Sequence, residues 1–161
     1  MWPLYLTREI HVQKRLSTSK NRVLSFIQDP ENILRTNPIL TSVIPDDINN
    51  SDVNASPAKE GRWYTIVEIV PTLGGREMST KFRCRWTKVE DGVDMEVHAG
   101  LGTRLTTRLR VEESGEEGKV DYSDVVKVQG LFLMMPFIVS RATRSHTMLG
   151  ELVAEKVVNK D

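Results

Sequence analysis

Apolar and polar residues alternate along most of the chain after residue 61, with the period of two that is typical of β-strands. Turn signals such as Asp91-Gly92 and Ser114-Gly115 separate the alternating segments, and one more such segment lies near the N-terminus. Connections this short favour antiparallel neighbours. Gly100 and Gly102 predict a sharp bend or bulge between two of the strands. The pattern predicts six strands, over residues 4–16, 63–70, 81–89, 93–99, 103–112 and 119–128.

Helical spacing replaces this alternation in three places. Ser17-Thr18-Ser19 offers N-caps for a short helix over residues 20–28, and Pro30 can begin a second one that reaches residue 36. Residues 45–61 are rich in Asp, Asn, Ser and Pro, and they are expected to form a loop. A long helix is predicted over residues 133–158. One apolar stripe runs along it at spacings of three and four: Met135, Ile138, Ala142, Leu149, Leu152 and Val153.

This order of elements indicates an α+β fold class. We expect a curved antiparallel sheet of six to seven strands with two short helices and a long C-terminal helix that covers the concave face of the sheet. A long helix across a curved sheet readily leaves a cavity, so the two are expected to enclose a pocket. A chain of 161 residues can bury a sizeable core, and residues 1–161 are expected to form a single domain.

The charge balance argues against nucleic acid as a partner. The chain has 22 basic and 22 acidic residues and therefore no basic excess. No transmembrane segment is expected either, because the longest apolar run, residues 130–139, is interrupted by Pro136. The single cysteine, Cys84, cannot form an intramolecular disulfide, which favours a reducing, cytoplasmic location. The oligomeric state stays open between a monomer and a homodimer.

No metal ion or cofactor is expected. His11, His98 and His146 fall in separate predicted elements, without the HxH or HExxH spacing of metal sites. The chain has no glycine-rich phosphate loop, since Leu73-Gly74-Gly75 is a turn signal, and it has no GxSxG nucleophile elbow. Any chemistry would therefore rest on side chains alone.

Three short stretches carry a resemblance to known proteins. They are Asn37-Pro38, residues 97–102 (Val-His-Ala-Gly-Leu-Gly) before a strand, and residues 133–138 (Leu-Met-Met-Pro-Phe-Ile) at the start of the last helix. With the order of elements, they resemble the SRPBCC superfamily, also called START-like or Bet v 1-like, and within it an uncharacterised fungal family. The resemblance implies the helix-grip fold. The superfamily includes lipid-transfer domains, plant hormone receptors, aromatic polyketide cyclases and coenzyme Q-binding proteins, and it has no universal catalytic residues to transfer.

Four polar residues fall on faces that should be apolar. Arg8, Glu68 and Asp124 each alternate with apolar residues in a predicted strand, and His146 lies about 40° from Ala142 on the helical wheel. A buried charge is costly unless it is paired. One interpretation is a structural ion pair, such as Arg8 with Asp124, or a position near solvent. The other is an acid–base set in the pocket, in which His146 exchanges protons and Asp124 or Glu68 orients it or holds a substrate hydroxyl.

Large apolar residues on the faces assigned inward are expected to line the pocket. They are Tyr64, Ile66, Phe82, Trp86, Leu105, Tyr122, Met135, Ile138 and Leu149. The cluster of Met134, Met135, Phe137 and Met148 is expected to belong to the core, although methionine would also suit the wall of a pocket for an irregular apolar ligand. Cys84 is expected to pack in the core rather than to be a reactive thiol, and His98 is expected to face outward.

Three functions are compatible with this pattern. The first is a cofactor-independent cyclase or isomerase of fungal secondary metabolism, in which the cavity holds an apolar polyketide- or terpenoid-like substrate in one folded conformer. The second is a non-catalytic protein that binds or transfers a lipid or an apolar metabolite. The third is an interaction domain with a collapsed cavity. Convergent polar groups inside the cavity would favour the first, and a wholly apolar cavity with a wide mouth the second.

Overall fold

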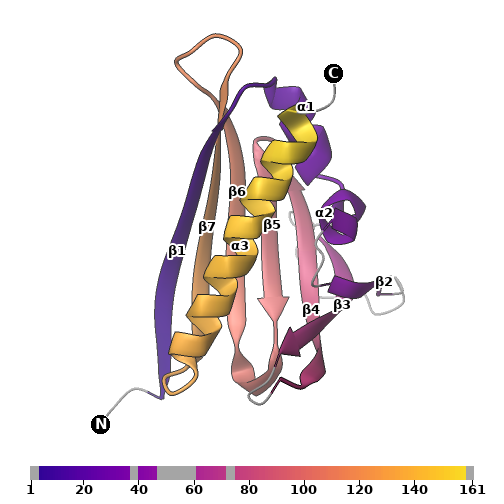
Figure 1. The fold of residues 1–161 in the computed structure, drawn as a ribbon, viewed down its shortest axis with the longest axis vertical. Helices are drawn as coiled ribbons and strands as arrows, with labels where there is room; N and C mark the ends of the chain where they lie inside the picture. Colours follow the sequence, from indigo (N-terminus) through magenta and orange to yellow (C-terminus); the bar gives the residue numbers. More distant parts are fainter. Residues whose placement is uncertain (1–3, 37–39, 47–60, 72–74, 159–161) are drawn as a thin grey trace.

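The computed structural model describes residues 4–36, 40–46, 61–71 and 75–158. Seven antiparallel strands form one curved sheet in the order β1-β7-β6-β5-β4-β3-β2, and the long helix α3 lies across its concave face (Figure 1). This is the architecture expected from the sequence. The strands are β1 (Tyr5–Leu16), β2 (Leu40–Pro45), β3 (Arg62–Pro71), β4 (Glu77–Val89), β5 (Gly92–His98), β6 (Arg104–Glu113) and β7 (Val120–Leu131). The helices are α1 (Lys20–Ile27), α2 (Pro30–Thr36), η1 (Gly100–Gly102) and α3 (Met135–Val158).

Two glycines let α3 lie close to the sheet. A Cβ added to Gly130 of β7 would come within 2.9 Å of Ile138 Cδ1, and one added to Gly150 of α3 would be 3.3 Å from Val12 Cγ1. Larger residues at these positions would push the helix outward. The helix therefore packs on β1 and β7, and it leaves the strands on the other side of the sheet less closely covered (Figure 1).

One end of the space between α3 and the sheet is closed by α1. Ser19 caps this helix by accepting a hydrogen bond from the backbone N–H of Arg22. The side chain of Gln28 donates to the carbonyl oxygens of Val89 (2.8 Å) and Gly92 (3.3 Å), which ties the end of α1 to the β4–β5 turn. Four valine and isoleucine side chains from α1 and the C-terminal half of α3 are almost completely buried here: Val23, Ile27, Val153 and Val157.

The register of the strands agrees with the inward faces inferred from alternation. Tyr64, Ile66, Cys84 and Trp86 are all buried, while Arg83 and Arg85 lie on the outer face. His98 also lies on the outer face, as expected, where its Nε2 is 2.7 Å from Glu96 Oε1. Arg83 and Arg85 therefore belong to a solvated outer surface.

The sequence missed one strand. Residues 40–45 form β2, which pairs with β3 and has a register shift between Leu40 and Ser42. An edge strand with an irregular register need not show alternation along its sequence, which is why the pattern did not reveal it. The predicted loop begins where β2 ends, but residues 47–60 lie outside the described part of the chain, as do Asn37 and Pro38. Strand β4 also begins at Glu77, earlier than expected.

The predicted bend between β5 and β6 is the short helical turn η1. Its backbone is closed by hydrogen bonds from Ala99 N to Thr103 O (2.9 Å) and from Thr103 N to Gly100 O (3.2 Å). Leu101 at its tip has φ 57° and ψ 30°, the left-handed conformation that non-glycine residues seldom adopt. None of the helices in the described ranges combines the length and the apolarity that a membrane span requires.

Candidate functional site

A cavity of about 950 Å³ lies between α3 and the concave face of the sheet. A volume of this size suits a small organic ligand. Most of its wall is apolar, and the expected lining residues Ile66, Phe82, Trp86, Leu105, Ile138 and Leu149 all contribute to it. The polar side chains on the wall include Glu68, Thr80, Thr103, Thr107, Arg141, Ser145 and His146.

Three residues expected to line the cavity do not. Tyr64, Tyr122 and Met135 are buried, so their faces were inferred correctly, but they lie within the packed core. Alternation gives the face of a strand and not the position of a residue along it. Tyr64 and Tyr122 belong to the cluster that includes residues of α1 and the C-terminal half of α3, and Met135 packs in a second cluster with Ile10.

Asp124 and His146 form a hydrogen-bonded pair behind the wall of the cavity. His146 Nδ1 is 2.6 Å from Asp124 Oδ2. The Asp124 side chain is completely buried, whereas that of His146 is 13% exposed and lines the cavity. Asp124 itself does not line the cavity, so the expectation that both residues face it holds for His146 alone.

This pair orients the imidazole ring. A carboxylate can only accept hydrogen bonds, so Asp124 favours the tautomer with the proton on Nδ1 and the lone pair on Nε2. Nε2 of His146 forms no hydrogen bond with any of the described residues. A histidine held in this way can take a proton from a ligand and return it.

The phenol of Tyr122 lies in the same buried region. Burial, and then the nearby negative charge of Asp124, raise the pKa of Tyr122 well above its usual value. Oδ1 of Asp124 and the hydroxyl of Tyr122 are both buried without a hydrogen-bond partner among the described residues. These two polar groups are therefore buried next to His146 without hydrogen bonds, which lowers the stability of the fold. Such destabilising burial is characteristic of functional sites.

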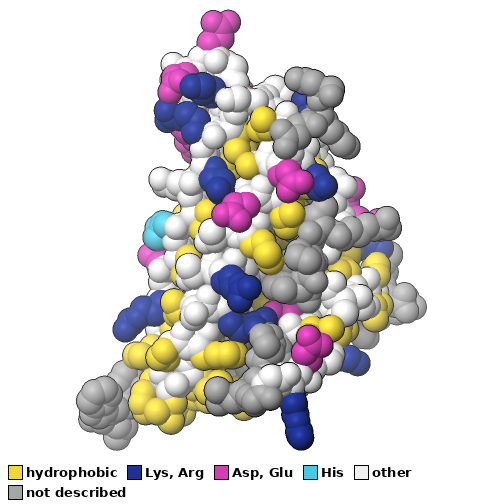
Figure 2. Space-filling model, in the orientation of Figure 1, with side chains coloured by type: hydrophobic (Ala, Val, Ile, Leu, Met, Phe, Trp, Pro, Cys, Tyr) yellow, Lys and Arg dark blue, Asp and Glu magenta, His cyan; other side chains and the backbone are white. Residues whose placement is uncertain are grey.

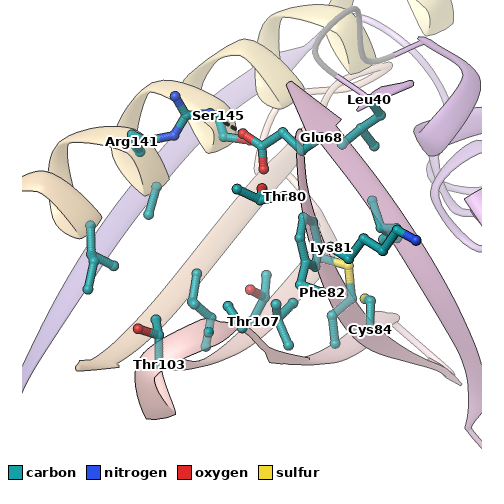
Figure 3. Close-up of a pocket in the computed structure, with 18 of the residues that line it drawn as sticks. Leu40, Glu68, Thr80, Lys81, Phe82, Cys84, Thr103, Thr107, Arg141 and Ser145 are labelled. Atoms are coloured by element: carbon teal, nitrogen blue, oxygen red, sulfur yellow. Dashed lines mark hydrogen bonds and ion pairs between the residues drawn. The ribbon is translucent and has the colours of Figure 1, made fainter. Parts of the chain in front are cut away.

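A second polar pair crosses the cavity. Arg141 of α3 and Glu68 of β3 form an ion pair, and Figure 3 shows it with Ser145 and Thr80 close by. Both side chains are partly exposed, at 27% for Arg141 and 17% for Glu68. The pair joins the helix to the side of the sheet that α3 does not pack against. It can hold a polar group of a ligand, because each member retains some contact with solvent.

Arg8 does not belong to this site. Its side chain is exposed, and its guanidinium donates to the carbonyl oxygen of Thr7 at 3.1 Å. In the strand register Arg8 lies opposite Val128, whereas Asp124 lies opposite Val12. Four residues along a strand correspond to roughly 13 Å, so an Arg8–Asp124 pair is not formed. The expectation was wrong because β1 is an edge strand whose side chains can turn to solvent.

Cys84 and the aromatic and methionine residues complete the wall. Cys84 lines the cavity but is 3% exposed, and burial raises the pKa of its thiol to about 12, which makes it unreactive. Met134 and Phe137 line the cavity and are partly exposed at its mouth, so they belong to the wall rather than to the core. No cluster of three or more metal-binding side chains occurs in the part of the chain that the structure describes.

Sequence reasoning missed Arg141 and Ser145. Both carried a signal, because Arg141 is three residues after Ile138 and Ser145 is four residues after Arg141 on the same helix. Thr103 and Thr107, both buried, are also missing from the expected site. Threonine is common on strand faces, so its alternation alone does not distinguish a cavity wall from a packed core.

Comparison with protein families gives one match over most of the chain. The model of a family described as a domain of unknown function (DUF7053) matches residues 16–159. A comparison with curated proteins finds no match.

Solved structures share the fold at low sequence identity. A truncated norcoclaurine synthase from Thalictrum flavum has a TM-score of 0.67 at 10% identity, covering 100% of this chain and 99% of that one. TTHA0849 from Thermus thermophilus has a TM-score of 0.60 at 14% identity, covering 93% and 97%. The di-domain ARO/CYC BexL from the BE-7585A biosynthetic pathway has a TM-score of 0.63 at 15% identity, and this chain spans 51% of its length. The chain therefore has the Bet v 1-like helix-grip fold.

Proposed function

The chain belongs to the DUF7053 family, and we propose that it is a cofactor-independent cyclase or isomerase that acts on an apolar small molecule in the cavity between α3 and the sheet. The observation that carries this proposal is the Asp124–His146 pair, in which the buried Asp124 holds a histidine that lines an otherwise largely apolar wall. A simple binding cavity gains nothing from a buried carboxylate, which costs stability. A proton-transfer site needs one, because it holds the imidazole in one orientation and stabilises its protonated form.

The mechanism begins with the shape of the cavity. Apolar walls such as Ile66, Leu105 and Leu149 bind the substrate in a folded conformer, which brings its reacting atoms together. The ion pair of Glu68 and Arg141 holds a carbonyl or hydroxyl oxygen of the substrate. The barrier that remains is the transfer of a proton to and from carbon.

His146 carries out this transfer. Its Nε2 takes a proton from the carbon next to a carbonyl group, and the electron pair of the broken C–H bond forms the enolate. In an isomerisation, Nε2 returns the proton to another carbon of the same system. In a cyclisation, the enolate carbon attacks a second carbonyl of the substrate, and the proton goes to the new alkoxide. Asp124 is a positioning residue, since it touches His146 and not the substrate.

The finer substrate class is also part of this proposal. We infer a polyketide- or terpenoid-like substrate of fungal secondary metabolism. Support comes from structural neighbours named as ARO/CYC proteins of biosynthetic pathways and from a norcoclaurine synthase. These are likenesses of fold, so the substrate class rests on the apolar wall and on the few oxygen-binding side chains of this chain.

A second function has its own supporting observation. The mouth of the cavity is bordered by exposed apolar side chains, among them Leu101 and Phe137, which suits a protein that collects and releases an apolar ligand. A carrier of this kind would need the cavity but not His146. The two functions therefore differ in what the removal of His146 does.

The test uses a ketone probe and measures proton transfer directly. Purified protein is incubated with phenylacetone in deuterated water, and exchange at the α carbon is followed by NMR. The parent should accelerate exchange, His146→Ala should lose roughly a hundredfold of the rate, and Asp124→Asn should lose about tenfold. His98→Ala is the matched control, because His98 lies on the outer face, and it should match the parent.

Folding and ligand binding are measured on the same samples. His98→Ala should unfold within a few degrees of the parent, whereas His146→Ala and Asp124→Asn should unfold at a lower temperature because each weakens the buried pair. All three variants should still be folded at the assay temperature and should bind phenylacetone. If His146→Ala folds, binds the probe and exchanges it as fast as the parent does, the enzyme proposal is wrong and the carrier function is favoured.

A further inference from the structure

Exposed large hydrophobic residues gather at the open end of the cavity. Leu133 is 77% exposed and Leu101 is 69% exposed, which is unusual for leucine. Figure 2 shows hydrophobic side chains together at the lower end of the molecule, where α3 begins. We call this group the rim patch, and it consists of Leu4, Met78, Leu101, Leu133, Met134 and Phe137.

The rim patch is continuous with the cavity. Met78, Leu101, Met134 and Phe137 are all both exposed and part of the cavity wall. They come from β4, η1 and the start of α3, so they approach the mouth from different sides. An apolar surface thus leads from the outside of the molecule into the cavity.

The fold holds one of these side chains outward at a cost. Leu101 has φ 57°, a conformation that is strained for leucine and would not be for glycine. The turn is fixed from both sides, by the hydrogen bonds between Ala99 and Thr103 and by Tyr5, whose hydroxyl would lie 2.8 Å from a Cβ on Gly102. This turn is strained, is fixed on both sides and exposes a leucine side chain. Such a turn indicates that the leucine contacts another surface.

Positive charge accompanies the rim patch. Arg8, Arg104 and Arg144 are exposed, and they form no ion pair among the described residues. In β1 and β6, Arg8 and Arg104 lie close to the strand ends at the mouth, and Arg144 is one turn beyond Arg141 on α3. Figure 2 shows basic groups next to the hydrophobic ones.

Negative charge collects at the opposite end of the molecule. The β6–β7 turn and the strand ends beside it carry five acidic residues: Glu112, Glu113, Glu116, Glu117 and Asp121. Glu116 and Asp121 form ion pairs with Arg15 and Lys119, so the acidic excess at this end comes from the other three. The net charge of the chain is zero, but its charges are unevenly distributed. Such a molecule turns its basic end towards a negatively charged surface.

We propose that the rim patch docks on the surface of an anionic lipid membrane, with the mouth of the cavity facing the bilayer. The apolar side chains insert among the lipid headgroups, and Arg8, Arg104 and Arg144 bind lipid phosphates. An apolar ligand then passes between bilayer and cavity without crossing water. The proposal goes beyond the proposed function, since both a cyclase and a carrier could draw their ligand from a membrane.

Vesicle binding tests the proposal without any substrate. The protein is sedimented with vesicles of phosphatidylcholine mixed with phosphatidylserine and, separately, with vesicles of phosphatidylcholine alone. It should bind the anionic vesicles at least about tenfold more strongly, and high salt should remove most of this difference. No binding to anionic vesicles at low salt would overturn the proposal, and it would leave the exchange assay for the enzyme function unaffected.

Matched variants locate the surface. Leu101→Asn keeps the left-handed turn, because asparagine tolerates it, and Phe137→Gln keeps the helix. Each should weaken vesicle binding by about tenfold, since one large apolar side chain no longer inserts. Ile44→Thr is the control, because Ile44 is 53% exposed on the edge strand β2 and does not line the cavity. It should bind vesicles as the parent does.

Two results would contradict the assignment. The first is that Ile44→Thr weakens vesicle binding as much as Leu101→Asn does, which would mean that adsorption is unspecific. The second is that the parent is a dimer in solution and becomes a monomer in Leu101→Asn and Phe137→Gln, which would assign the rim patch to a second copy of the chain.

An Arg104→Ser, Arg144→Ser double variant should lose the preference for anionic vesicles.

Discussion

The two ends of the space under α3 are built in opposite ways. At the closed end, Val23 and Ile27 of α1 meet Val153 and Val157 of α3, and all four are 0–1% exposed. At the open end, Phe137 in the first turn of the same helix is half exposed beside the cavity. One helix thus supplies packing at its C-terminal half and a binding surface at its N-terminal half. Stability and ligand access are therefore separated along α3.

The largest expected effect contrasts the two ends directly. Ile27→Ala should lower the free energy of unfolding by about 3 kcal/mol, because it leaves a cavity in a fully packed region. Phe137→Ala should lower it by less than about 1 kcal/mol, because that side chain is half exposed and already borders a cavity. Urea unfolding followed by circular dichroism measures both. Equal losses would show that the open end is packed as tightly as the closed end.

The next effect contrasts the two polar pairs. Asp124→Ala should lower the free energy of unfolding by about 2 to 4 kcal/mol, because it leaves His146 without its partner next to a new void. Glu68→Ala should cost less than about 1 kcal/mol, because Arg141 is partly exposed and can turn to solvent. The same unfolding measurement applies. If Glu68→Ala lowered the free energy of unfolding more than Asp124→Ala, the Glu68–Arg141 pair would be the one that stabilises the fold.

A smaller effect, the pH dependence of stability, tests whether water reaches the Cys84 thiol in the cavity wall. Burial raises the pKa of Cys84 to about 12, so the folded protein keeps this proton while the unfolded chain loses it above the usual thiol pKa of 9.0. Stability should therefore fall as the pH rises above 9, and the share due to Cys84 should reach about 1.4 kcal/mol near pH 10.

Cys84→Ala isolates this share, because its stability should decline less steeply between about pH 9 and pH 10.5 than that of the parent. Thermal unfolding at a series of pH values measures the difference. Parallel curves for the two proteins would mean that water reaches the thiol in the folded state.

The sequence was sufficient for most of the fold. The period-two segments from residue 61 onward and the apolar stripe of α3 each identify an element and its buried face, because burial on one side is what imposes the period. Strand β2 was not predicted because the sequence of an edge strand with a register shift need not alternate between apolar and polar residues. The start of β4 escaped because Glu77 to Ser79 are exposed and show no alternation of burial.

The site was only partly predictable. Alternation placed Asp124 on the inner face and helical spacing did the same for His146, but their hydrogen bond depends on the register between α3 and β7, which neither segment contains. Arg8 shows the limit of alternation, since the face of an edge strand is not always covered by another element. Tyr122 shows a second limit, since an inward face includes both packed core and cavity wall.

Binding of an apolar dye decides whether α3 and the sheet enclose a functional pocket. Nile red is titrated into the parent, into Leu105→Trp, which fills the cavity from the sheet, and into Ile44→Trp, which adds the same side chain on the edge strand. The parent and Ile44→Trp should bind one dye per chain saturably, and Leu105→Trp should bind it at least about tenfold more weakly while remaining folded. Binding that is unsaturable in the parent, or unchanged in a folded Leu105→Trp, would contradict a functional cavity at this site.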